Sequence, residues 1–179
     1  RDILCLGLLM SKNKKNNFLD YGSNILSLSN LDIKINLNSF NIFIYDPFAK
    51  KKKKINTPFK ILIINDKNHL KKINFNIVNF GSCIQYMEDL KDLESSINFS
   101  KVSVIIITHT PITLGKIYFS RQSNHKNLIQ YIHNFNFLVK FFKKKNFKLI
   151  FKSRNDDKYI ACSKKKTKTY SLNLIFRKN

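Results

Sequence analysis

The sequence predicts an α+β protein with a mixed or antiparallel sheet, a long helix in the C-terminal half, a three-strand meander after it, and lysine-rich loop protrusions. Three observations carry this prediction. Apolar and polar residues alternate from Leu31 to Leu37, as in a half-buried strand. The β-branched run "KVSVIIIT" over 101–108 is typical of a buried central strand. Apolar residues then recur at helical spacing over 124–145, and three short apolar segments follow.

The elements before residue 66 are a first buried element and several strands. The apolar run Ile3 to Met10 favours a buried helix or strand. Residues 41–45 and 59–64 are dense in apolar residues, and breakers follow the first and precede the second. Five consecutive lysines lie between them, so we expect a hairpin with these lysines at its tip.

The middle of the chain alternates short elements. A helical turn is expected over 67–73 and a short strand over 75–80. The segment "MEDLKDLESSI", 87–97, spaces its apolar residues as an amphipathic helix does. The central strand follows, and we expect Pro111 to end it.

The C-terminal part is predicted as one long helix and a meander. The helix covers 124–145 and closes on three lysines, which favour the negative end of the helix dipole. Strands are expected over 147–152, 158–163 and 169–177, separated by polar turns.

The length of 179 residues and the 43% of hydrophobic residues suit a single compact domain over 1–179, with a possible subdivision near 98–100. The cysteines Cys5, Cys83 and Cys162 are far apart and have no spacing typical of zinc ligands or of a disulfide framework. We therefore expect buried, reduced thiols.

Charge is the extreme feature of the composition. The chain has 33 Lys and Arg against 11 Asp and Glu, a net charge of +22. The positive charges of such a chain repel one another unless a polyanion neutralises them. Nucleic acid is the first expected partner of this kind, and an anionic membrane surface is the second. Most of the bases are lysines, which suit phosphate contacts better than base readout. An AT-rich genome also enriches Lys, Asn, Ile and Phe, and it competes with this interpretation.

The lysines gather in three acid-free clusters at expected connections or element ends. A solvated loop usually mixes charges, so the clusters are interpreted as phosphate-binding, with solvated loops as the alternative. The predicted RNA-binding residues are Lys50, Lys51, Lys52, Lys53, Lys54, Lys143, Lys144, Lys145, Lys164, Lys165, Lys166, Lys168 and Arg177.

Motifs for chemistry are missing from the sequence. Glycine is scarce, and no phosphate-binding glycine loop, nucleophile elbow, KH loop or RRM octamer occurs. His109, His125 and His133 are the best chemical candidates, but no partner for any of them is evident. No catalytic residue, metal site or cofactor is predicted.

The function that follows is structural. The sequence predicts an rRNA-binding ribosomal component, not an enzyme, whose partners are rRNA and neighbouring ribosomal proteins, with no small-molecule substrate. Composition alone suggests a mitochondrion or another organelle with an AT-rich genome. The alternatives are a peripheral subunit of an organellar membrane complex and a nucleic-acid-processing enzyme.

Overall fold

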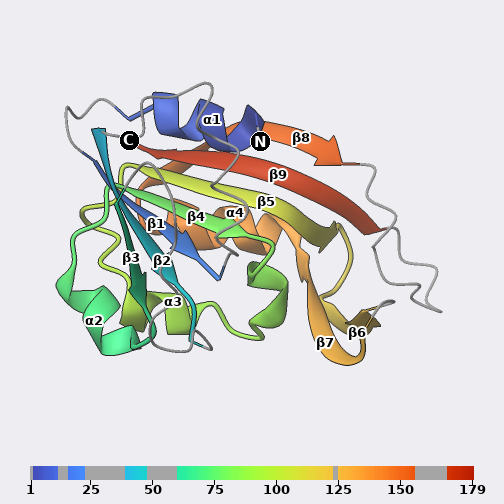
Figure 1. Cartoon of the computed structure of the whole chain (residues 1–179). Coiled ribbons are helices and arrows are strands. Elements are labelled where there is room, and N and C mark those ends of the chain that lie inside the picture. The colour runs from blue at the N-terminus through green and yellow to red at the C-terminus, as the bar shows by residue number, and fades with distance from the viewer. Residues whose placement is uncertain (1, 12–15, 23–38, 48–59, 123–124, 156–168) are drawn as a thin grey trace.

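The computed structural model describes residues 2–11, 16–22, 39–47, 60–122, 125–155 and 169–179 (Figure 1). Its helices are α1 (Asp2–Leu9), α2 (Lys67–Lys72), α3 (Lys91–Ser96) and α4 (Phe135–Lys143), with a 3-10 turn η3 (Ile84–Tyr86). Its strands are β1 (Asn16–Tyr21), β2 (Phe40–Tyr45), β3 (Ile61–Ile64), β4 (Ile77–Gly81), β5 (Val104–Thr113), β6 (Tyr118–Gln122), β7 (His125–Asn134), β8 (Phe147–Asn155) and β9 (Thr169–Lys178).

A mostly parallel sheet forms the centre of the protein. Its seven main strands lie in the order β3-β2-β1-β4-β5-β9-β8. The first five pair in parallel, β9 runs antiparallel beside β5, and β8 pairs with β9 in turn. The β6–β7 hairpin joins at the carboxyl end of β5, where Ile112 pairs with His133. This topology is a Rossmann-like, doubly wound one.

The predicted α+β fold with a mixed or antiparallel sheet is therefore wrong. The predicted hairpin shows why. β2 and β3 are both strands, as expected, but they pair in parallel, with Ile42 beside Ile61. Parallel strands need a long crossover connection instead of a tight turn. Apolar patterning identifies a strand and carries no information on the direction of its neighbour.

The predicted long helix over 124–145 is also wrong. Residues 125–134 form strand β7, which pairs antiparallel with β6, and the helix starts only at Phe135. Asn134 caps it, since its side chain accepts a hydrogen bond from the Phe137 amide at 2.9 Å. Pro111 does not end the central strand, because β5 continues to Thr113.

The end of the chain is not a three-strand meander in its expected form. Strands at 147 and 169 are present, but β9 lies between β5 and β8 and bonds with both. Residues 158–163, expected as the middle strand, lie outside the described residues. The antiparallel pairing of β8 with β9 therefore closes a parallel sheet.

Apolar side chains cover both faces of the sheet. On one face α1 packs Leu4 and Leu8 against Phe18 and Ile106. On the other face side chains of α2, α3 and α4 pack with strand residues, and Phe142 of α4 contacts the Phe176 ring at 4.9 Å between centroids. Burial on both faces explains the continuous apolar run in β5. None of the described helices has the length and apolar character needed to cross a membrane.

Candidate functional site

The strand order marks one place on this sheet for a ligand. The chain moves from β1 outward to β2 and β3, then returns to β4 on the other side of β1. In open α/β sheets, ligands bind outside the carboxyl ends of the strands at such a reversal. The residues that follow β1, β2 and β4 at this edge are Gly22, Asp46 and Ser82.

Gly22 directly follows β1 and brings the backbone close to the end of β4. Its φ is +75°, a left-handed conformation that costs glycine little. A Cβ at this position would lie 2.8 Å from Cβ of Cys83. The Gly22 amide donates to the Tyr45 carbonyl at 2.9 Å. The ends of β1, β2 and β4 therefore converge on a position that leaves no room for a side chain.

Asp46 lies at the carboxyl end of β2 and is half-buried. Its amide donates to the Ile64 carbonyl at 3.0 Å, which fixes the backbone at this point. Burial, together with the carboxylates of Asp66 and Asp46, raises the pKa of the Tyr45 phenol above its ordinary value. Both carboxylates thus lie near the Tyr45 side chain. A carboxylate at this end of β2 is placed to accept hydrogen bonds from ligand hydroxyls.

A buried polar pair joins β1 and β4 beneath this edge. Asp20 is fully buried, and the side-chain amide of Asn79 donates to it at 2.9 Å. Burial, followed by the charge of Asp20, strongly raises the pKa of the Cys83 thiol. Cys83 therefore stays a neutral thiol, and a thiolate nucleophile is excluded here.

The other side of the edge is formed by η3 and β7. His133 on β7 is fully buried, and Nε2 of its ring lies 3.2 Å from the Ile84 carbonyl. Burial lowers the pKa of His133, so the ring is neutral at pH 7. Its Nδ1, the Gln85 Oε1 and the Gln130 Nε2 are buried and have no hydrogen-bond partner among the described residues. Such atoms are candidates for contacts with water or a ligand.

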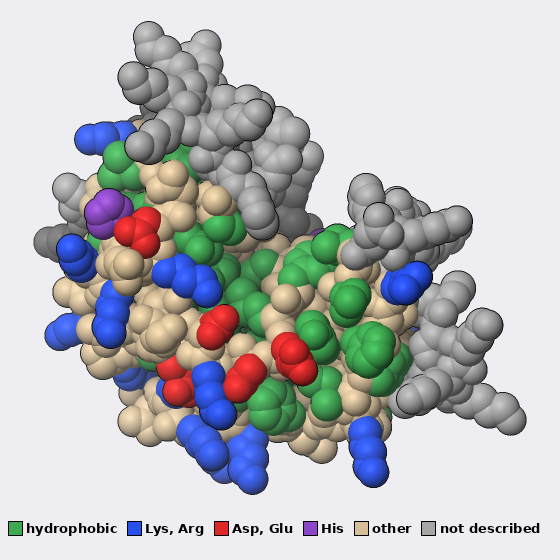
Figure 2. Space-filling model, turned by 90° about the horizontal axis from the view of Figure 1, so that it is seen from below, with side chains coloured by type: hydrophobic (Ala, Val, Ile, Leu, Met, Phe, Trp, Pro, Cys, Tyr) green, Lys and Arg blue, Asp and Glu red, His purple; other side chains and the backbone are tan. Residues whose placement is uncertain are grey.

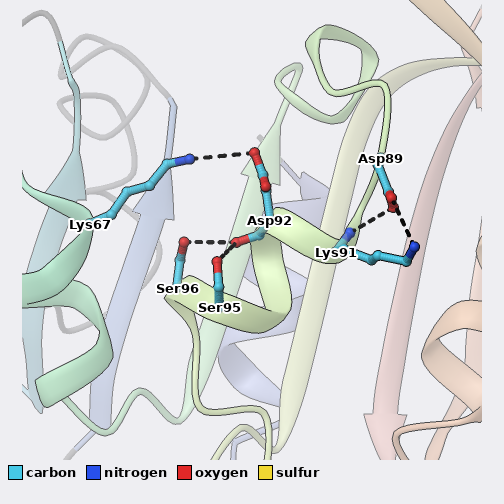
Figure 3. Close-up of polar contacts among 6 residues, drawn as sticks. All are labelled: Lys67, Asp89, Lys91, Asp92, Ser95 and Ser96. Carbon is cyan, nitrogen blue, oxygen red and sulfur yellow. Dashed lines mark hydrogen bonds and ion pairs between the residues drawn. The ribbon is translucent and has the colours of Figure 1, made fainter.

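Exposed ion pairs link α2 with α3 and α3 with the turn before it (Figure 3). Lys67 of α2 contacts Asp92 of α3 at 3.5 Å, and Lys91 lies 3.5 Å from the Asp89 carboxylate. The hydroxyls of Ser95 and Ser96 donate to the Asp92 carbonyl at 2.9 and 2.8 Å. These exposed pairs contribute little to stability, but they neutralise acids on this side of the molecule.

The predicted RNA-binding lysines do not come together at this edge. Lys143 ends α4 and Lys144 and Lys145 follow it, near the amino end of β8, where the Asn179 amide donates to the Asn146 carbonyl at 3.0 Å. Lys145 is also ion-paired with Glu94 and lies over the Phe141 ring. Arg177 pairs across from Lys148 at the same end of the sheet. Residues 50–54 and 164–168 lie outside the described residues.

The three candidate histidines do not form a common site among the described residues. His109 lies at a bulge of β5 with a φ of +50°, exposed, and its Nδ1 is 3.2 Å from the Asn155 side-chain amide. His133 is buried as described above, and the His125 side chain lies outside the described residues. Within the described part of the chain, no group of three or more His, Cys, Asp or Glu could hold a metal ion.

Sequence reasoning missed Gly22 and Asp46. Each had a visible signal: a glycine directly after the strand "NNFLDY", and an aspartate directly after "FNIFIY". Neither pattern indicates a ligand site by itself, because a single glycine does not make a phosphate-binding loop and because Asp46 followed by Pro47 is also typical of a strand breaker. Parallel pairing is what turns these two strand ends into neighbours.

Comparison with solved structures identifies the fold. A SAM-dependent methyltransferase from Methanosarcina mazei superposes with a TM-score of 0.63 at 10% identity, covering 99% of this chain and 97% of that one. Magnesium protoporphyrin IX methyltransferase from Synechocystis, with bound SAH, gives 0.61 at 14% identity, covering 99% and 81%. The chain has the fold of these methyltransferases. A putative RNA methyltransferase from Pyrococcus horikoshii gives 0.55 at 14% identity, covering 99% and 81%.

Neither a protein-family model nor a curated protein sequence matches the chain. The likeness is therefore one of fold, at identities too low to carry sequence motifs across.

These comparisons overturn the predicted function. The prediction of a structural rRNA-binding ribosomal component, not an enzyme and without a small-molecule substrate, is wrong, because the structures that share this fold are SAM-dependent enzymes. Several of them hold SAM or SAH. Of the earlier interpretations, the alternative of a nucleic-acid-processing enzyme stands nearer to these findings. Ribosomal partners have no support here.

Proposed function

We propose that this protein binds S-adenosylmethionine at the carboxyl edge between β1 and β4 and transfers its methyl group to an acceptor. The observation that carries the proposal is the convergence of Gly22 and Asp46 at the reversal of the strand order, in a fold shared with methyltransferases.

The residues of the edge fit such a cofactor. The left-handed Gly22 keeps the backbone free of a side chain where a ligand has to approach closely. The Asp46 carboxylate would accept hydrogen bonds from the ribose hydroxyls of the cofactor, in the way that an acidic residue binds the ribose in dinucleotide-binding Rossmann sheets. The buried Gln85 lies in η3, two residues after Cys83, and its Oε1 has no hydrogen-bond partner in the described part of the chain.

Methyl transfer from this cofactor requires the protein mainly to position the two reactants. When bound, the cofactor supplies a methyl group already activated on a sulfonium sulfur. The chain's residues then orient the cofactor and the acceptor atom in line, which is catalysis by positioning. No acidic or basic group at the edge has to form a covalent bond. The neutral Cys83 thiol agrees with this, since the site needs no nucleophile of its own.

Titration with S-adenosylhomocysteine by isothermal calorimetry tests the proposal. We expect Asp46→Asn to weaken this binding about 10- to 100-fold, because hydrogen bonds to a charged acceptor are worth about 1.5–3 kcal/mol. Asp92→Asn is the matched control. It removes the same charge from an exposed side chain of α3 and leaves the hydrogen bonds to its backbone carbonyl in place.

Two results would contradict the proposal. The first is a wild-type protein that binds no S-adenosylhomocysteine at millimolar concentration. The second is an equal loss of affinity in Asp46→Asn and Asp92→Asn, which would show that only the net charge matters.

A further inference from the structure

Acidic residues are absent from long parts of this chain. From Ser95 to Asn155, and again from Thr169 to Asn179, the chain contains no aspartate or glutamate. These segments form β5 to β9 and α4. The exposed acids of the described chain lie instead before α2, between η3 and α3, and on α3, and Figure 2 shows most of them near the middle of the face seen from below. Three of these acids are already paired with lysines.

The β6–β7 hairpin stands at the carboxyl end of β5 and belongs to the acid-free part of the chain. β7 pairs with the last residues of β5 and packs on η3. The Tyr118 hydroxyl bonds with Thr169 at the start of β9, which holds the hairpin against the end of the β8–β9 pair. The Tyr131 hydroxyl donates to Glu88 at 3.2 Å, just after η3. Both contacts fix the hairpin beside the site.

One face of this hairpin is outward and combines rings, apolar groups and positive charge. Phe119 on β6 is 69% exposed, and Arg121 follows it two residues later on the same face. Opposite them on β7 lie Tyr131 and the exposed Ile129. Lys116 precedes β6 and is exposed. Figure 2 shows hydrophobic side chains gathered on the right, the side on which Figure 1 places β6 and β7.

Neither Lys116 nor Arg121 forms an ion pair with a described carboxylate. An exposed ring with unneutralised cations around it is the arrangement by which proteins bind single-stranded nucleic acid: bases stack on the ring, and phosphates meet the cations.

We propose that the outward face of the β6–β7 hairpin, defined by Lys116, Phe119 and Arg121, binds single-stranded RNA and presents a nucleotide to the proposed methyl-transfer site. This inference rests on the proposed function for the identity of the neighbouring site. It differs from a general attraction of a basic protein for polyanions, because it assigns the contact to one hairpin and not to the lysines at the other end of the sheet.

The test measures fluorescence anisotropy of a labelled 16-nucleotide single-stranded RNA of mixed sequence, with the full chain, between 50 and 200 mM KCl. We expect Phe119→Ala to weaken binding about tenfold, since stacking on one ring is worth a factor of this order. We expect the double variant Lys116→Ser, Arg121→Ser to reduce the log–log salt slope by about 1.4, or roughly 0.7 for each lost phosphate contact.

The matched control is Lys143→Ser, Lys144→Ser. It removes the same charge from exposed side chains at the opposite end of the sheet, and its salt slope should equal that of the wild type. All the substituted side chains are exposed, so circular dichroism should show an unchanged fold.

Three outcomes would overturn the inference: equal slopes in the two double variants, unchanged affinity in Phe119→Ala, or binding to phosphatidylserine vesicles with none to RNA. Titration of the same hairpin variants with S-adenosylhomocysteine separates the two proposals. We expect their cofactor affinity to match the wild type. A wild type that binds RNA through the hairpin but binds no S-adenosylhomocysteine would refute the methyltransferase proposal and leave the RNA surface standing.

Discussion

Substituting Gly22 by alanine tests the geometry of the proposed site most directly. Two costs add at this position. An L-residue in the left-handed region costs about 1–2 kcal/mol. The new Cβ would lie 2.8 Å from Cβ of Cys83, well inside the ordinary contact distance of about 3.5–4 Å, and relief of such overpacking costs about 1–3 kcal/mol more.

We therefore expect Gly22→Ala to lower the free energy of unfolding by about 2–5 kcal/mol, and the melting temperature by at least about 4 °C for a chain of this size. Binding of S-adenosylhomocysteine should weaken as well, because the end of β1 has to move away from β4. Denaturant unfolding and calorimetry measure the two effects on the same protein.

Two further variants divide the cost between its causes. Gly22→Asn carries the same Cβ but tolerates the left-handed conformation better, so its backbone strain should be smaller than that of alanine, while the close contact with Cys83 remains. Cys83→Gly removes the atom that the new Cβ would meet, and a double-mutant cycle with Gly22→Ala should show a favourable coupling of about 1 kcal/mol or more. Wild-type stability and wild-type affinity in Gly22→Ala would refute the reasoning, since neither cost would then exist.

Two other predictions concern the interior. Burial lowers the pKa of His133, so the unfolded chain takes up a proton at a higher pH than the folded one, and the free energy of unfolding should fall as the pH drops below about 6.5. His133→Gln should reduce this fall. If the free energy of unfolding changed equally in the wild type and in the variant between pH 7.5 and 5.5, the prediction would be contradicted. Phe142 is fully buried and its ring contacts those of Phe99 and Phe176, so Phe142→Ala should lower the free energy of unfolding in urea by about 3–5 kcal/mol. A decrease of less than about 1 kcal/mol would mean that α4 is not packed on the sheet.

The local sequence pattern predicts several strands and helices of this fold, but it does not predict how they are arranged. The strand expected over 59–64 appears as β3 and the one over 41–45 within β2, and Leu93 lies on the buried face of the expected amphipathic helix. The sequence does not show that β2 and β3 pair in parallel, because a buried parallel strand and a strand of a hairpin have similar apolar runs. The apolar residues of 125–134 fit the period of a helix and that of a strand, and antiparallel pairing with β6 makes the segment a strand.

The site depended even more on tertiary structure. Gly22 and Asp46 are 24 positions apart in sequence, and their functional meaning appears only when β1 and β2 lie side by side in register. Charge, by contrast, was visible from composition. Composition does not show which cations lie beside the site. Lys143 and Arg121 count equally as basic residues, but they lie at opposite ends of the sheet.

The place of β9 constrains how the chain reaches its native state during synthesis. β9 is the last of the described strands to leave the ribosome, yet it bonds along most of its length with β5 on one side and β8 on the other. Until it emerges, β5 has one bare edge along residues such as Ile105 and Ile107, which are fully buried in the finished protein. A nascent chain stalled before Thr169 would therefore display an apolar, unpaired strand edge, which makes it a substrate for chaperones and a starting point for aggregation.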